Sequence, residues 1–203
     1  MEFIFIIAIL IMSVVIHEVS HGYAALALGD PTAKYQGRLT LNPIAHLDPV
    51  GSFIVPAIGY FLGGFIIGWA RPVPFNPYNL KSAKWGEAIV AVAGPISNIA
   101  IAILFGIIIR IGNSQELLSP NFLSLASFVV LINIILAVFN LIPIPPLDGS
   151  KILFSILPYK WNKIRWQLER FGLIFVFLFI FLFWHILSPI IYELYSMIVG
   201  IPL

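Results

Sequence analysis

Long apolar runs are the strongest constraint on this chain, because each helix that crosses a bilayer needs about 20 consecutive apolar residues. Four runs have this length, and they cover roughly residues 3–28, 88–110, 122–142 and 171–187. The first run follows Met1-Glu2 without a basic stretch and lacks a small-residue cleavage pattern, so we expect a retained span and not a signal peptide. The sequence therefore predicts a membrane all-α protein, a polytopic bundle of about four spanning helices.

A fifth apolar run, residues 51–68, is interrupted by Pro56 and by several glycines. Such breaks free backbone groups that lipid cannot satisfy, so this backbone must be buried within the protein or line a wet cavity. We therefore expect a re-entrant segment over 51–75 that can include short β-strands.

Composition excludes several classes of function. Hydrophobic residues make up 60% of the chain and charged residues only 10%, far from the composition of a soluble protein. The net charge of +2, without a clustered basic face, excludes nucleic acid as the main partner. The lipid bilayer is therefore an expected partner. The chain has no cysteine, so a metal site must use His, Asp or Glu.

The first apolar run contains His17-Glu18-Val19-Ser20-His21, an HExxH motif. Residues i and i+4 share one face of a helix, so both imidazoles can bind one divalent metal while Glu18 deprotonates a water beside it. The alternative is a polar contact between helices. Burying three ionisable groups within five residues of a membrane span is costly, and a shared metal explains all three.

A catalytic metal site usually has three protein ligands and one open position, so a third ligand is required. Asp148 is the favoured candidate, because it follows three prolines that end the third run and precedes Gly149. Broken backbone at this depth must line a cavity. The alternative is that Asp148 only caps a helix expected over 150–157. His46, in the loop after the first span, is an accessory candidate.

These motifs resemble the site-2 protease family of intramembrane zinc metalloproteases. The resemblance rests on three stretches in this order: 17–21, Gly94-Pro95-Ile96-Ser97-Asn98, and Asn140-Leu141-Ile142-Pro143 running into Leu147-Asp148-Gly149. It covers most of residues 1–157. The resemblance is to the compact members of the family, which carry no PDZ or CBS domain.

The resemblance implies the roles of five residues. His17, His21 and Asp148 would bind one zinc ion per chain. Glu18 would be the catalytic base, and Asn140 would lie close to the substrate. We expect His46 to make turn contacts more readily than to reach the metal. We assign residues 1–157 to a catalytic membrane core and residues 158–203 to a cytoplasmic linker and a C-terminal membrane helix.

The metal site predicts the topology. The histidines lie in the second half of the first span and Asp148 follows the 122–142 span, so these helices must end on the same side. A full crossing by 51–68 would separate them, and re-entrance is therefore required. Ten of the eleven Lys and Arg residues then lie on the side of the metal, all except Arg110. The positive-inside rule makes that side cytoplasmic, in a multi-pass protein of a prokaryotic cell membrane.

The expected activity is hydrolysis of peptide bonds within or near transmembrane segments of membrane proteins by metal-activated water. A substrate helix must first unwind, and the 51–75 region could pair with it as an added strand or simply fill space. Two alternatives remain at this stage. One is a membrane-embedded metal hydrolase that acts on a lipid or prenylated substrate, and the other is a divalent-metal carrier.

Overall fold

The computed structural model describes residues 2–54, 70–82, 84–115, 117–158 and 161–200. Within this part of the chain, four helices are long and apolar enough to cross a membrane: α1 (Glu2–Ala27), α4 (Gly86–Ser114), α5 (Pro120–Asn140) and α8 (Gly172–Val199). The described residues contain no strand. The predicted membrane all-α fold with about four spanning helices is confirmed.

The shorter elements lie in the connections. They are α2 (Thr32–Tyr35), the 3-10 turns η1 (Pro43–His46) and η3 (Pro77–Asn79), the π-helical turn η2 (Val50–Ile54), α6 (Asp148–Ile156) and α7 (Asn162–Arg170). Most of the predicted re-entrant segment, residues 55–69, falls outside the described residues. The described flanks, 51–54 and 70–75, do not form the expected short strands.

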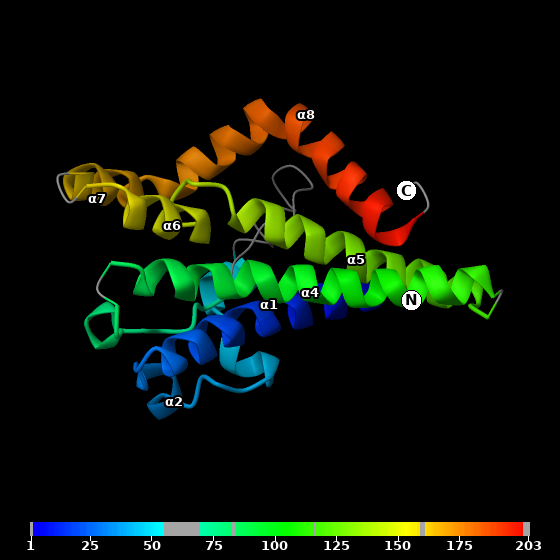
Figure 1. The fold of residues 1–203 in the computed structure, drawn as a ribbon, viewed down its shortest axis with the longest axis horizontal. Helices are drawn as coiled ribbons and strands as arrows, with labels where there is room; N and C mark the ends of the chain where they lie inside the picture. Colours follow the sequence, from blue (N-terminus) through cyan, green and yellow to red (C-terminus); the bar gives the residue numbers. More distant parts are fainter. Residues whose placement is uncertain (1, 55–69, 83, 116, 159–160, 201–203) are drawn as a thin grey trace.

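The connections gather at two ends of the bundle. Figure 1 shows α2, α6 and α7 at one end, where α1 finishes and α4 begins. The connection between α4 and α5 lies at the opposite end, together with the end of α8. The last turns of α1 and α5 thus point the same way along the bundle, which lets residues that follow α5 approach the second half of α1.

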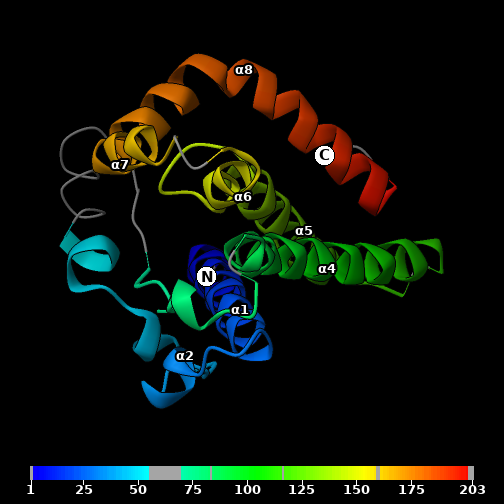
Figure 2. The same cartoon turned by 60° about the vertical axis from the view of Figure 1, so that its left-hand side comes forward.

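Helix α4 is the centre of the bundle and contacts α1, α5, α6 and α8. Figures 1 and 2 both show α1 on one side of α4 and the α5–α6 segment on another. The main apolar core joins α4, α5 and α8, and its fully buried members are Ala102, Ile109, Ala126, Val130, Ile134, Ile191, Tyr195 and Val199. Several of these side chains are small, which allows the helices to pack closely where lipid supplies no hydrophobic driving force.

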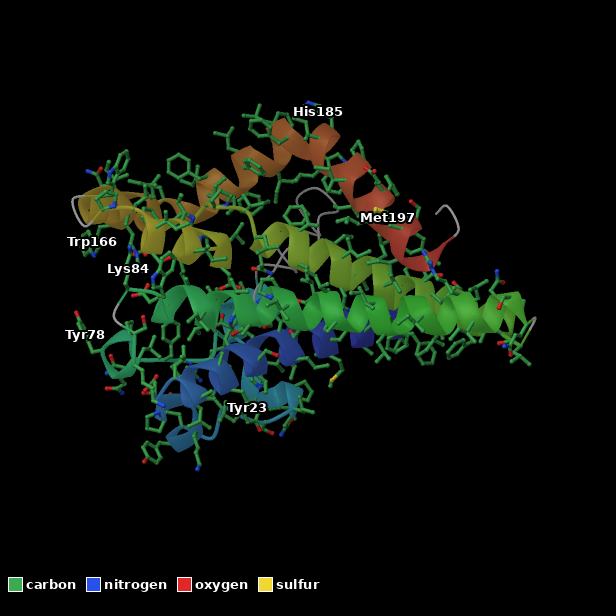
Figure 3. All side chains as sticks on the ribbon, viewed as in Figure 1. Tyr23, Tyr78, Lys84, Trp166, His185 and Met197 are labelled. Carbon is green, nitrogen blue, oxygen red and sulfur yellow. The ribbon has the colours of Figure 1, made fainter. Side chains whose placement is uncertain are left out.

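Helix α8 is longer than the run of apolar residues suggested. It continues through Pro189 and ends at Gly200, whose φ of 84° is left-handed. Proline is tolerated inside membrane helices because neighbouring groups satisfy the freed carbonyl. His185 lies near the middle of α8 and points away from the bundle (Figure 3).

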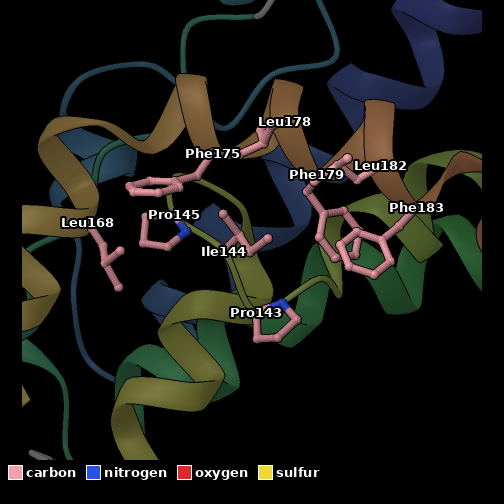
Figure 4. A pocket seen from close by; sticks show the side chains of 9 residues that line it. All are labelled: Pro143, Ile144, Pro145, Leu168, Phe175, Leu178, Phe179, Leu182 and Phe183. Carbon is pink, nitrogen blue, oxygen red and sulfur yellow. The ribbon is translucent and has the colours of Figure 1, made fainter.

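The turn that precedes α6 is covered by the first half of α8. Figure 4 shows Pro143, Ile144 and Pro145 facing phenylalanine side chains of α8 across an apolar hollow of about 210 Å³. Three prolines in four residues end α5 and prevent the helix from continuing. The turn therefore reverses the chain and delivers the start of α6 to the bundle interior.

Asp30 fastens the loop that follows α1. Its carboxylate is fully buried and accepts hydrogen bonds from Thr32, from the Asn79 side chain at 2.8 Å and from the Asn76 backbone N–H at 2.6 Å. Burial alone would raise the pKa of Asp30, but these hydrogen bonds lower it below its usual value of 3.8. Asp30 thus ties the end of α1 to residues 76–79.

We expect Asp30→Asn to destabilise the fold by about 1–3 kcal/mol, because the amide group turns a donor toward a buried N–H that needs an acceptor. Because the pKa of Asp30 is lowered on folding, its contribution is present above pH 3.8 and is lost as the pH falls through the lower folded value. In detergent, the native protein should therefore unfold at a higher temperature than Asp30→Asn at pH 7, and this difference in unfolding temperature should become smaller in acid. A difference that does not change with pH would contradict this role.

Candidate metal centre

The two histidines of the HExxH motif lie side by side on α1, and both are buried. Their Nε2 atoms are 3.0 Å apart, as expected for residues one helical turn apart on the same face. They face α4 at Gly94, where a Cβ would lie 2.5 Å from His21 Nε2 and 2.6 Å from His17 Nε2. Only glycine leaves room for the imidazole pair against α4.

Asp148 reaches the histidines from the first turn of α6. Its Oδ2 atom lies 3.1 Å from His17 Nε2 and 3.0 Å from His21 Nε2. Its carboxylate makes no helix-capping hydrogen bond, and α6 begins at Asp148 itself. A Cβ at Gly149 would collide with the carbonyl oxygens of Leu141 and Ile142, so glycine lets α6 start directly against the end of α5. The alternative capping role is therefore not what the side chain does here.

The donor atoms of this group fit a divalent metal. His21 Nδ1 donates to the Val90 carbonyl at 2.7 Å, and His17 Nδ1 lies 2.6 Å from Asn98 Oδ1. With both Nδ1 atoms used as donors, the two Nε2 atoms and the carboxylate oxygen all present lone pairs to one point. The three ligand atoms lie within 4.8 Å of one another. Two imidazoles and a carboxylate with such second partners are typical of a catalytic zinc site.

Lys151 completes the surroundings of Asp148. Its Nζ lies 3.1 Å from Asp148 Oδ1, the oxygen that faces away from the histidines, and it sits over the Phe75 ring. Burial alone would raise the pKa of Asp148, but its contacts with His17 and His21 and the charge of Lys151 lower it well below 3.8. Asp148 is therefore an anion at neutral pH.

Glu18 lies next to the ligand group and is held from outside the helix. Its Oε2 accepts a hydrogen bond from the Val73 backbone N–H at 2.9 Å. Val73 belongs to a non-helical segment, residues 70–76, and its side chain lies against α1 at Gly22. The hydrogen bond from its N–H fixes the carboxylate beside the candidate ligand group, which does not include Glu18.

The 70–76 segment is itself fastened by its backbone. The buried Arg38 side chain donates to the carbonyls of Arg71 and Pro72, and the Arg71 N–H donates to the His46 carbonyl at 2.9 Å. Asp30 holds the other end at Asn76. The N–H groups of Arg71, Val73 and Asn76 and the carbonyls of Arg71 and Pro72 are therefore already occupied.

Two connected hollows surround the site. A small one of about 110 Å³ is lined by the ligand group, Glu18, Asn140 and Lys151. A larger one of about 790 Å³ shares His17, Glu18 and Asn140 and runs to the junction of α7 and α8, residues 169–174. Asn140 stands where they meet, and its Nδ2 donates to the Leu136 carbonyl at 2.9 Å. His17, Glu18 and Asn140 therefore line both hollows.

Five of the six candidate residues come together, and His46 does not. It is buried in the η1 turn, where its Nε2 donates to the Thr40 carbonyl at 2.8 Å, and it is outside the ligand group. Sequence reasoning missed the contact of Asn98 with His17, and it missed Lys151 and Val73. The sequence did contain a signal for the Asn98 contact, because a buried amide in a spanning helix needs a hydrogen-bond partner.

Comparisons with known proteins agree with this geometry. The model for peptidase family M50 matches residues 104–183, which include Asn140 and Asp148. The chain is 38% identical over 182 residues to the "Putative zinc metalloprotease YwhC" of Bacillus subtilis, covering 87% of this chain and 80% of that protein. No solved structure matches the chain significantly.

Two further relatives carry similar names. "Putative zinc metalloprotease Rip2" of Mycolicibacterium smegmatis is 30% identical over 177 residues, which are 86% of this chain and 65% of that protein. A third zinc metalloprotease of the same naming, from Methanocaldococcus jannaschii, is 32% identical over 173 residues, or 84% of this chain and 76% of that protein. With these relatives and its four spanning helices, the chain is an integral membrane protein that belongs to peptidase family M50, the site-2 protease family.

Proposed function

We propose that this protein is an intramembrane zinc endopeptidase that hydrolyses peptide bonds within or near the transmembrane segments of membrane proteins. The observation that carries the proposal is the convergence of His17, His21 and Asp148 inside the bundle, with Glu18 beside them. The names of the relatives, all zinc metalloproteases, support the same metal and reaction. A carrier would need ligands along a path, whereas these gather at one depth.

The three ligands would hold one zinc ion per chain. Such an ion is a Lewis acid that makes water nucleophilic near neutral pH and polarises a carbonyl. Glu18 would take the proton from the attacking water and pass it to the leaving amine. The Val73 N–H keeps that carboxylate in place.

The substrate would lie in the larger hollow as an unwound segment. Its walls come from α1, the end of α5 and the start of α8, so a helix of another membrane protein could enter from the bilayer. Asn140 would hold exposed substrate backbone at the point where the hollow meets the ligand group. Because the Val73 N–H is bonded to Glu18 and both ends of residues 70–76 are fastened within the protein, we assign this segment to holding Glu18.

We place the site near the cytoplasmic face of a prokaryotic cell membrane. Ten basic residues lie in the connections on the side of the ligand group by sequence, against Arg110 alone in the spans toward the other side. The relatives come from Bacillus, Mycolicibacterium and Methanocaldococcus, which are prokaryotes.

The proposal is tested by two isosteric variants with different expected defects. Glu18→Gln should keep zinc and lose at least about 100-fold in cleavage, because the amide cannot accept the proton. Asp148→Asn should lose most zinc and activity, because a neutral oxygen replaces an anionic ligand. Metal analysis of the purified proteins and proteomics of membrane fractions give the two readouts. In the proteomics, transmembrane peptides cut by the native protein should remain whole.

Glu193→Gln, a similar change in the second half of α8, is the matched control and should leave both quantities unchanged. Loss of zinc from Glu18→Gln would make Glu18 a ligand instead of the base. An Asp148→Asn protein with native zinc content and cleavage would overturn the metal centre. Cleavage of a lipid by the native protein without any protein substrate would favour a lipid hydrolase.

The orientation is testable because the chain has no cysteine. We expect an impermeant maleimide to label Leu117→Cys from outside intact cells, and to label Tyr35→Cys and Trp166→Cys only after permeabilisation. All three positions are strongly exposed in the structure. Labelling of Tyr35→Cys and Trp166→Cys from opposite sides would overturn the shared location of the loops after α1 and α5.

A further inference from the structure

A chain of buried amides leads away from the candidate metal centre. It runs from His17 on α1 to Asn98 on α4, then to Asn133 on α5, and returns to Ser13 on α1. Asn98 and Asn133 are fully buried, and Ser13 is nearly so. Asn133 has no contact with a ligand other than through Asn98 in the described hydrogen bonds, so its role is not explained by the site itself.

The direction of every hydrogen bond in this series of amides follows from one backbone carbonyl. Asn133 Nδ2 lies 2.8 Å from the Val129 carbonyl oxygen, which can only accept. The nitrogen of the Asn133 amide therefore points there and toward Ser13 Oγ, at 2.9 Å. Its Oδ1 is consequently the atom that faces Asn98.

The same reasoning carries the direction to the histidine. Asn133 Oδ1 can only accept, so the Asn98 Nδ2 group must face it, at 2.8 Å. Asn98 Oδ1 then faces His17 Nδ1 at 2.6 Å and requires a proton there. A neutral imidazole protonated on Nδ1 carries its lone pair on Nε2, which is the atom aimed at Asp148 and His21.

We infer that Asn133 is a positioning residue that sets the tautomer of His17 through the orientation of the Asn98 amide. A flipped Asn98 would present its NH₂ group to His17 Nδ1 and drive the proton to Nε2, where it would block metal binding. Without Asn133, only a contact of 3.4 Å from Asn98 Nδ2 to the Ser13 carbonyl opposes that flip. This inference rests on the proposed zinc site.

Three variants test the inference through zinc affinity, measured by competition with a chromophoric chelator in detergent. Asn133→Leu keeps the side-chain size and should weaken zinc binding by about 10-fold or more, in the range seen for outer-shell partners of metal ligands. Asn98→Asp, combined with Asn133→Leu, should restore most of the affinity. A carboxylate accepts from His17 Nδ1 in either orientation, so it no longer needs to be oriented.

The matched control is Ile134→Ala, which removes a buried neighbour on α5 and should lower thermal stability without changing zinc affinity. Nitrogen-15 NMR of the imidazole groups gives an independent readout. The Nδ1 atom of His17 should be protonated in the native protein, and the tautomers should mix in Asn133→Leu.

The outcomes separate this inference from the proposed function. If the native protein binds no zinc at this site, the proposed function and the inference both fail. If the native protein binds zinc and Asn133→Leu binds it equally well, only the inference fails. A loss of affinity that Asn98→Asp does not restore, or that Ile134→Ala reproduces, would assign Asn133 to packing alone and would also overturn it.

Discussion

Ionisable and amide groups inside an apolar bundle are stable only where they satisfy one another, and this condition organises the whole structure. The ligand atoms of α1 and α6 meet one another, while their outer nitrogens find partners on α4. Helix α4 can receive them only because Gly94 has no side chain. The position of α6 in turn depends on the proline turn after α5. The contacts of the polar centre and the packing of the four helices therefore depend on each other.

The sequence predicted the parts of the fold that depend on the length of the apolar runs. Bilayer thickness sets the length of a spanning helix, so four apolar runs predicted four spanning helices. The predicted end of the last span was wrong. The apolar run stops just before Pro189, but the helix continues through this proline. There the backbone continues, and Arg110 donates hydrogen bonds to the carbonyls of Met197 and Ile198 in the last turn of the helix. Such a partner lies 87 residues or more away along the chain and leaves no local pattern.

The candidate site was predictable to the extent that its chemistry is local. HExxH places two imidazoles on one helix face, and the broken backbone before Asp148 marks a cavity. The partners of these residues are not local. Asn98 and Asn133 are visible in the sequence as amides in apolar runs, but their pairing depends on how α4 and α5 cross. Val73 acts through its backbone N–H, which every residue except proline has, so no side-chain pattern could single it out.

The site rests on two separate supports. The candidate metal ligands His17 and His21 are oriented from within the bundle, by the Asn98 amide and by the Val90 carbonyl. Glu18 is oriented from the loop side, by a segment that Asp30 and Arg38 fasten at its two ends. These sets of hydrogen bonds share no residue. A disturbance of the loop can therefore misplace the proton acceptor while the ligand group stays assembled, and a disturbance of the amide chain can weaken the ligand group while Glu18 stays in place. The division matches the proposed chemistry, because a metal must be held tightly and a carboxylate that takes and returns a proton must stay accessible to water and substrate.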